Sequence, residues 1–115
     1  MPVISYDDIE LADVKMEGAD KVLKAIVISE REGWDDYVLR VVRLGAGGFS
    51  PEHSHDWEHV NYVISGRGKL HLGDSTYELA ERDFAFVPPE QPHQFENPYE
   101  EDLEFICIVP SRGEV

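Results

Sequence analysis

The chain contains five histidines, and four of them fall into two short segments whose spacing suits a metal site. His53, His55 and His59 lie close together, and His93 follows a proline-rich stretch further along. Imidazole is a common ligand of zinc, copper, iron, nickel and manganese. Residues two apart on an extended chain face the same side, so His53 and His55 can point into one cavity. His59 can reach this cavity across a turn, and His93 can reach it from a distant segment. We predict that these four histidines bind a divalent metal once the chain has folded.

Two nearby residues are weaker candidates. His71 lies between Leu70 and Leu72 with no partner at a matching spacing, so we interpret it as a surface or hydrogen-bonded histidine. Glu58 is the alternative to His59, but it is one residue too close to His55 and faces the other side of an extended chain. Four neutral imidazoles leave the charge of a divalent metal uncompensated, which favours Lewis acidity and disfavours a higher oxidation state. A closed, structural zinc site is the main alternative.

The elements that must position these residues are predicted to be strands. Short runs rich in β-branched and aromatic residues alternate with glycine and proline, and only residues 6–14 could form a short helix. The glycines at 45–48 are predicted to end one strand, and Gly73-Asp74-Ser75 is predicted to turn a hairpin. Such a pattern is typical of a sandwich or a closed barrel. The strands are expected at residues 22–29, 37–44, 59–65, 69–72, 76–79, 84–87 and 103–109.

Composition limits the classes of function. A chain of 115 residues is expected to form one domain. We divide it into an N-terminal segment, residues 1–20, which packs on the barrel or on a partner, and a main domain, residues 21–115. The net charge of -14 disfavours nucleic acid as a partner. The single cysteine, the absence of a signal peptide pattern and the absence of a long apolar stretch predict a cytoplasmic protein that does not enter a membrane.

The histidine segments resemble the two motifs of the cupin superfamily. Gly47, the His53-Ser54-His55 run, His59 and Gly66 resemble the first motif, in which the position of His59 is usually glutamate. Pro88, His93 and Asn97 resemble the second motif, with Glu90 where glycine is usual. Together they cover residues 47–97. The segments 53–59 and 104–110 are similar to small single-domain cupins in which four histidines bind manganese. The resemblance implies an all-β cupin double-stranded β-helix, a jelly-roll β-barrel in one domain, and a homodimer.

The same resemblance implies a metal and a pocket. It favours manganese or iron with two open coordination positions, whereas zinc, nickel and copper remain alternatives that the donor set allows. It places Phe105 and Cys107 beside the metal, although Cys107 is equally well explained as a small buried hydrophobe. Strand parity puts Asn61 on the side of the histidines and Phe95 on the side of His93.

Trp57 and Arg40 have two interpretations each. Trp57 either caps the entrance of the pocket or serves as a packing or interface residue, which is the slightly favoured reading. Arg40 lies among apolar residues of an expected strand. It either anchors an anionic substrate or pairs with a carboxylate, and an outward-facing salt bridge is the simpler interpretation.

No other catalytic motif is evident, so chemistry must depend on the metal. The chain has no nucleophile elbow, phosphate loop or dinucleotide fingerprint. The first hypothesis is a metal-dependent oxidoreductase of dioxygenase type that acts on a small organic substrate. The second is a small-molecule binding or sensing module without turnover. Metal-assisted isomerisation ranks last, because no positioned acid or base stands out.

Overall fold

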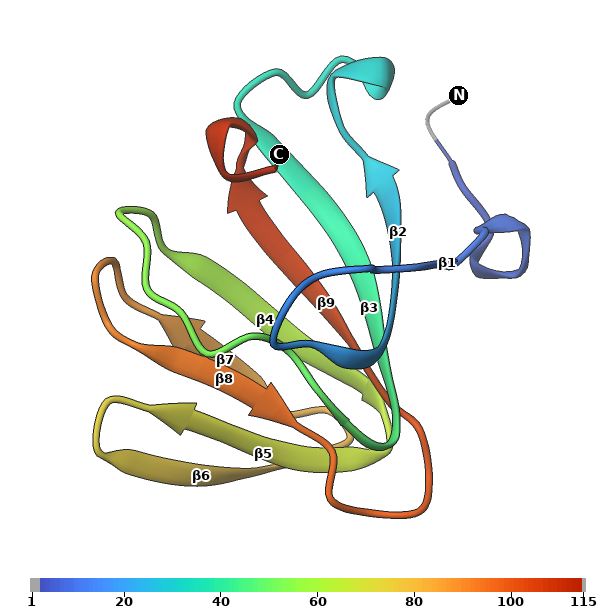
Figure 1. Ribbon diagram of the computed structural model, residues 1–115. Helices are drawn as coiled ribbons and strands as arrows, with labels where there is room; N and C mark the ends of the chain where they lie inside the picture. The colour runs from blue at the N-terminus through green and yellow to red at the C-terminus, as the bar shows by residue number, and fades with distance from the viewer. Residues whose placement is uncertain (1–2, 115) are drawn as a thin grey trace.

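The computed structural model describes residues 3–114, and antiparallel β-strands make up most of it (Figure 1). Residues 1 and 2 of the predicted N-terminal segment, and residue 115 of the predicted main domain, lie outside the described residues. The described residues include the short 3₁₀ turns η1 (Tyr6–Asp8), η2 (Glu30–Glu32) and η3 (Ser111–Gly113). The strands are β1 (Ala12–Asp13), β2 (Asp20–Ile28), β3 (Tyr37–Phe49), β4 (His59–Ser65), β5 (Arg67–Leu72), β6 (Ser75–Ala80), β7 (Phe84–Val87), β8 (His93–Glu96) and β9 (Leu103–Pro110).

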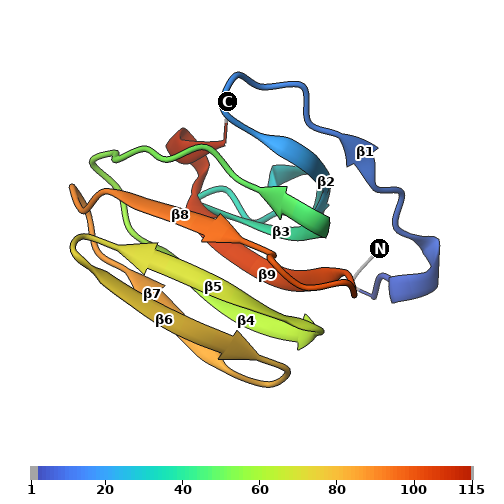
Figure 2. The ribbon, with the colours of Figure 1, turned by 60° about the horizontal axis from the view of Figure 1, so that its bottom comes forward.

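The described strands form one curled sheet. Their order is β6-β5-β8-β3-β9-β4-β7, with β2 added on β3 and β1 added on β2. The sheet folds over itself, so that β8, β5 and β6 form one layer and β3, β9, β4 and β7 form the other (Figure 2). The two end strands, β6 and β7, follow each other in the chain, and the turn between them is tied to β4 by a hydrogen bond from Arg82 N to Val63 O, 2.9 Å long. The prediction of an all-β jelly roll is confirmed.

The strand between residues 37 and 44 is longer than its glycines led us to expect. Instead of ending at Gly45, β3 continues to Phe49 and carries the chain towards β8. The glycines serve close packing here, because a Cβ on Gly48 would lie 2.8 Å from the backbone oxygen of Asp20. The prediction that these glycines end the strand is therefore wrong.

The core lies between the two layers. The largest fully buried apolar side chains in the described part of the chain are Leu44, Leu103, Val63, Val87 and Val109. They come from β3, β4, β7 and β9, whose alternate residues face inward. Burying each such side chain stabilises the fold by roughly 1.5–3 kcal/mol.

Asn97 is buried in this core and its polar groups are satisfied. Its side-chain amide donates to the backbone oxygens of Leu44, Gly45 and Glu101, at 3.0, 3.2 and 2.7 Å. Its side-chain oxygen accepts from the backbone N–H of Tyr99 at 3.0 Å. This residue therefore fixes the bend that leads from β8 into β9.

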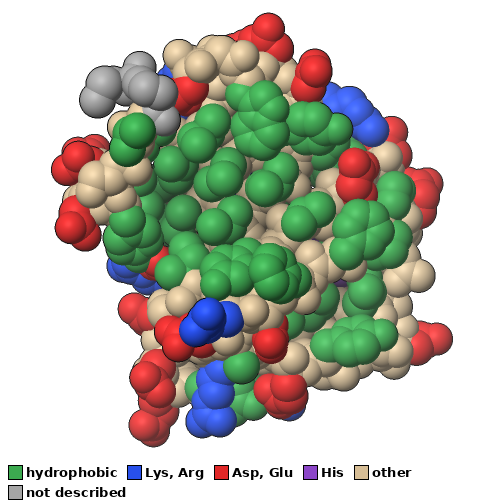
Figure 3. Space-filling model, turned by 180° about the vertical axis from the view of Figure 1, so that it is seen from behind, with side chains coloured by type: hydrophobic (Ala, Val, Ile, Leu, Met, Phe, Trp, Pro, Cys, Tyr) green, Lys and Arg blue, Asp and Glu red, His purple; other side chains and the backbone are tan. Residues whose placement is uncertain are grey.

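The outer face of β4 and β7 is apolar and exposed. Phe84, Phe86 and Val60 are 77, 55 and 43% exposed. Phe86 pairs with Val60, and Val60 pairs in turn with Ile108. These residues form a row of apolar side chains that runs from β7 across β4 to β9. Seen from behind, hydrophobic side chains cover a broad part of one face of the molecule (Figure 3). No helix in residues 3–114 has the length and apolarity needed to cross a membrane.

Candidate metal centre

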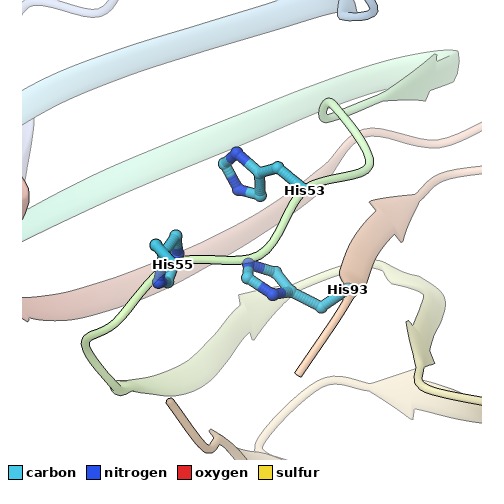
Figure 4. Close-up of side chains that lie close together, drawn as sticks. All are labelled: His53, His55 and His93. Atoms are coloured by element: carbon cyan, nitrogen blue, oxygen red, sulfur yellow. The ribbon is translucent and has the colours of Figure 1, made fainter. Parts of the chain in front are cut away.

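The loop between β3 and β4 brings the first two histidines against the start of β8. Backbone hydrogen bonds join His53 to His93 in both directions, at 3.1 and 2.9 Å. The rings of His53, His55 and His93 point towards one another (Figure 4). Each offers a nitrogen, and these three atoms lie within 4.8 Å of one another. Two nitrogen ligands on one ion are at most about 4.2 Å apart, since each bond is about 2.1 Å long, so this triad is close to ligating distance.

His59 reaches the same cluster from the first position of β4. It is 4% exposed, and its Nε2 lies 3.2 Å from Nε2 of His93. It is not part of the mutually close triad, although its ring centroid is 5.7 Å from that of His55. His59 as a fourth ligand therefore stays a prediction.

Hydrogen bonds on the other ring nitrogens direct the lone pairs of three histidines into the cluster. Nδ1 of His55 lies 2.8 Å from the backbone oxygen of Trp57, and Nδ1 of His93 lies 3.0 Å from that of Gln91. These oxygens can only accept, so in the neutral rings Nδ1 carries the hydrogen and Nε2 carries the free lone pair.

Asn61 fixes His59 in the same way. Its amide donates to the backbone oxygen of Ile106 at 3.3 Å, which turns its side-chain oxygen towards Nδ1 of His59, 2.8 Å away. Nε2 of His59 is then a lone-pair donor. Such fixed orientation by a second layer of residues is characteristic of metal-ligating histidines. Two lone pairs facing each other across 3.2 Å repel unless a cation or a proton lies between them, so the residues present fit a divalent metal.

Burial keeps these rings neutral. It lowers the pKa of His53, His59 and His93 to about 4, because the charged imidazolium is poorly solvated in the cavity. Burial also lowers the pKa of His55, and the nearby charge of Arg40 acts in the same direction. Neutral imidazole is the form that binds metal, so these histidines are in the metal-binding form at neutral pH.

The two weaker candidates lie elsewhere. His71 bonds Thr76 Oγ1 through Nδ1 at 2.9 Å and Glu96 Oε1 through Nε2 at 2.7 Å, and it does not line the cavity. The prediction of a hydrogen-bonded, non-ligating histidine agrees with this placement. Glu58 does not line the cavity either.

A cavity of about 520 Å³ opens beside the histidines. Trp57, Phe95, Phe105 and Cys107 line it, whereas Asn61 lies behind His59. The Trp57 ring stacks on His55, with centroids 4.1 Å apart and planes 2° apart. Much of the wall is therefore aromatic or aliphatic, as in most sites for small molecules.

Arg40 faces the cavity and not the solvent. It shares the parity of Val38, Val42 and Leu44, which are all buried, and it lines the cavity beside Cys107. The outward-facing salt bridge favoured from the sequence is wrong, although Arg40 does pair with a carboxylate, that of Glu114, at 3.0 Å. Val41, on the opposite face of β3, is buried as well, so strand parity alone does not distinguish the two faces, and the cavity lining is what places Arg40 inside.

Comparison with known proteins identifies the family. Residues 40–109 match the cupin domain model Cupin_2. The chain belongs to this family. A curated relative, the 1-methylthio-D-xylulose 5-phosphate methylsulfurylase of Rhodospirillum rubrum, is 34% identical over 71 residues, which are 62% of this cupin and 46% of that enzyme. An uncharacterised protein of Methanocaldococcus jannaschii is 32% identical over 50 residues, 44% of this cupin and 40% of that protein. The matches thus span less than half the length of these two relatives.

Solved structures resemble the whole cupin. The polyketide cyclase RemF of Streptomyces resistomycificus is 28% identical, with a TM-score of 0.89 over 96% of this chain and 79% of that one. A cupin-2 domain protein of Rhodospirillum rubrum is 26% identical, with a TM-score of 0.83 over 95% of this chain and 74% of that one. The jelly-roll fold is thus shared with both of these proteins.

Proposed function

We propose that this cupin is a metal-dependent enzyme that transforms a small organic substrate in the cavity beside the histidines. Manganese is the metal we propose first, and iron is the next candidate. His53, His55 and His93 would hold the metal, and His59 would be the fourth ligand. The first candidate chemistry is an oxidation of dioxygenase type.

The observation that carries this proposal is the convergence of imidazole lone pairs on a largely apolar cavity. Three Nδ1 atoms are engaged by oxygen acceptors, which leaves Nε2 of His55, His59 and His93 free to bind. Among the described residues, no aspartate or glutamate lines the cavity. A redox-active metal would supply activation of dioxygen there, and a redox-inert one would supply polarisation of a substrate oxygen.

The residues around the histidines would bind and orient the substrate. Phe95 and Phe105 stack with ring centroids 4.5 Å apart and present an apolar wall. Trp57, stacked on His55, covers the adjoining side. An apolar or aromatic substrate placed between these walls would exclude water from the reacting centre.

Oxygen uptake by protein of defined metal content tests the proposal. Protein purified without added metal is analysed for its elements, then stripped and reloaded with manganese, iron or zinc, and supplied with catechols, diketones and styrene-like alkenes. We expect oxygen consumption with manganese or iron, none with zinc, and none when the variant with His55 and His93 replaced by alanine is taken through the same loading. Stoichiometric native zinc with no oxygen uptake under any loading would contradict the dioxygenase chemistry.

Metal-assisted cyclisation is the second candidate. It is supported by the similarity to the polyketide cyclase RemF, which extends over 96% of this chain. Such a reaction uses no dioxygen, so zinc-loaded protein would convert an aromatic polyketide-like substrate without oxygen uptake. Substrate that binds in stoichiometric amount and is recovered unchanged under every loading would instead support the binding or sensing module.

We also propose that the apolar outer face packs against a second copy of the chain. Phe84 and Phe86 on β7 and Val60 on β4 form a row of exposed apolar side chains that β9 continues. Exposing such a contiguous area is unusual for a monomer and is typical of an interface. Two copies related by a twofold axis would cover the face on both.

A further inference from the structure

The cavity carries positive charge in an otherwise acidic molecule. The chain has 24 acidic and 10 basic residues. The charged side chains lining the cavity, apart from histidine, are Lys15, Lys24 and Arg40, and among residues 3–114 no carboxylate lines it. A metal held by neutral imidazoles would add further positive charge. The side chain of Lys15 is 88% exposed and pairs with Asp13, whereas Lys24 and Arg40 share a single carboxylate, that of Glu114. One positive charge at this end of the cavity is therefore not compensated, which favours an anionic ligand.

Lys24 and Arg40 already hold one carboxylate. Nζ of Lys24 is 2.8 Å from Oε2 of Glu114, and a terminal nitrogen of Arg40 is 3.0 Å from Oε1. Each oxygen of this carboxylate is thus taken by one cation. The three side chains are 26, 18 and 13% exposed, so the contacts are largely shielded from water. The pair of cations has a geometry that suits a carboxylate.

The bonding capacity of Arg40 is not filled by these contacts. A guanidinium has five N–H donors. One nitrogen of Arg40 bonds Glu114, and another lies 2.9 Å from the sulfur of Cys107, which is a weak acceptor. Its buried Nε has no acceptor within the described residues. A buried donor without a partner is costly, so an additional oxygen acceptor would be favourable here.

Glu114 is placed where a ligand could exchange with it. It follows η3, a single 3₁₀ turn with no buried residues. The turn is tied to the histidine loop by an exposed ion pair between Arg112 and Asp56, 2.7 Å long. Exposed pairs contribute little stability, so this ion pair adds little to the cost of moving Glu114. The turn is held more firmly at Ser111, whose hydroxyl donates to the backbone oxygen of Asp35 at 2.6 Å, so the exchange involves Glu114 and not the whole turn.

We propose that Lys24 and Arg40 form an anion-binding end of the cavity and hold the carboxylate of a small aromatic acid, in exchange with the carboxylate of Glu114. The body of the acid would lie against Phe95 and Phe105, which line the same cavity. The inference rests on the proposed function, because the ligand would occupy the cavity beside the metal, and it narrows the substrate to an organic carboxylate.

Calorimetric titration with benzoate, and with its neutral isostere benzamide, tests the inference on chelator-treated and on metal-loaded protein. We expect benzoate to bind both forms at least about tenfold more tightly than benzamide, because hydrogen bonds to a charged group are stronger than those to a neutral one. Arg40→Met and Lys24→Met should each weaken benzoate about tenfold or more. Glu114→Gln should strengthen it, because the internal competitor loses its charge. Lys69→Met removes one positive charge outside the cavity and should leave the affinity unchanged.

The outcomes separate this inference from the metal-dependent activity. The inference is overturned if Arg40→Met and Lys24→Met leave benzoate binding unaltered. It is also overturned if Glu114→Gln keeps the unfolding temperature of the parent protein but does not bind benzoate. Neither result bears on the metal chemistry. Arg40-dependent binding to metal-free protein supports the inference even where no oxygen uptake or conversion is found. Phenylphosphonate that binds more tightly than benzoate would overturn the assignment to carboxylates.

Discussion

The Nε2 atoms of His59 and His93 face each other across 3.2 Å, although 34 positions separate the residues in the chain. Both rings are buried, and the other nitrogen of each is engaged by an oxygen acceptor. The arrangement leaves two lone pairs pointing at the same space. It makes His59 the residue on which the ligand set can be tested most directly.

Replacing His59 with alanine should sharply reduce the metal content. The variant loses one lone pair at the cluster, whereas His71→Ala removes a ring bonded to Thr76 and Glu96 outside the cavity. His59→Glu should retain metal, because a carboxylate also binds divalent ions. Elemental analysis of the purified variants is the measurement. Equal metal in His59→Ala and His71→Ala would remove His59 from the ligand set.

Asn61 should control metal affinity without touching the metal. In Asn61→Leu the Nδ1 hydrogen of His59 loses its acceptor, and the tautomer with a free Nε2 is no longer fixed. We expect affinity to fall about 10–100-fold, as is usual for such supporting residues. Asn61→Asp keeps an acceptor and should lose much less. Competition with a metal-binding dye gives the affinities, and similar values for the two variants would show that orientation of His59 does not matter.

Metal-free protein should become less stable as the pH falls from 7 to 5. Burial holds the pKa of His53, His59 and His93 at about 4, below the ordinary value of 6.5. Between these values the unfolded chain binds protons that the folded chain does not, so stability is present above pH 6.5 and is lost as the pH approaches 4. The midpoint of thermal unfolding should fall over this range, and more steeply than in the His59→Gln, His93→Gln double variant. Parallel curves for the two proteins would be inconsistent with buried, neutral rings.

Two glycines with positive φ should respond very differently to alanine. At Gly66, φ is +80° and a Cβ would overlap the backbone oxygen of Asp102, whereas at Gly33, φ is +98° and nothing lies within 4 Å. Gly33→Ala should cost about 1 kcal/mol for its conformation alone. Gly66→Ala should cost about 3 kcal/mol or more, because the backbone of β9 must also move. Urea denaturation measures both, and equal losses would argue against the close approach of Gly66 to Asp102.

Placing charge on the outer face should separate the proposed dimer. Phe86→Glu introduces a carboxylate into the apolar row of β4 and β7, where desolvation would be costly. Tyr77→Glu on β6 is the matched control, because Tyr77 is 52% exposed and lies outside this row. Light scattering after size-exclusion chromatography should show a dimer for the parent and for Tyr77→Glu, and a monomer for Phe86→Glu. A monomeric parent protein would refute the proposed pairing.

Much of the fold was accessible from local patterns. The expected strands at residues 59–65 and 84–87 coincide with β4 and β7, because alternation and flanking turns are local signals. The glycines near residue 48 were misinterpreted, since a glycine that permits close backbone contact has the same sequence signal as one that ends a strand. The short β8 was not delimited from the sequence, where His93 was only expected to enter from another strand.

In the candidate site, too, some features could be predicted from the sequence and others depend on the folded structure. The sequence by itself determined which side chains can bind a metal and, through the two-residue period of a strand, which of them share a face. Only the tertiary structure decided that His59 meets His93, that Asn61 and the backbone oxygen of Gln91 orient these rings, and that Arg40 points inward to Glu114. The physical reason is that these relationships join segments far apart in the chain. They exist only after the sheet has curled over itself and brought β3, β4, β8 and η3 around one cavity.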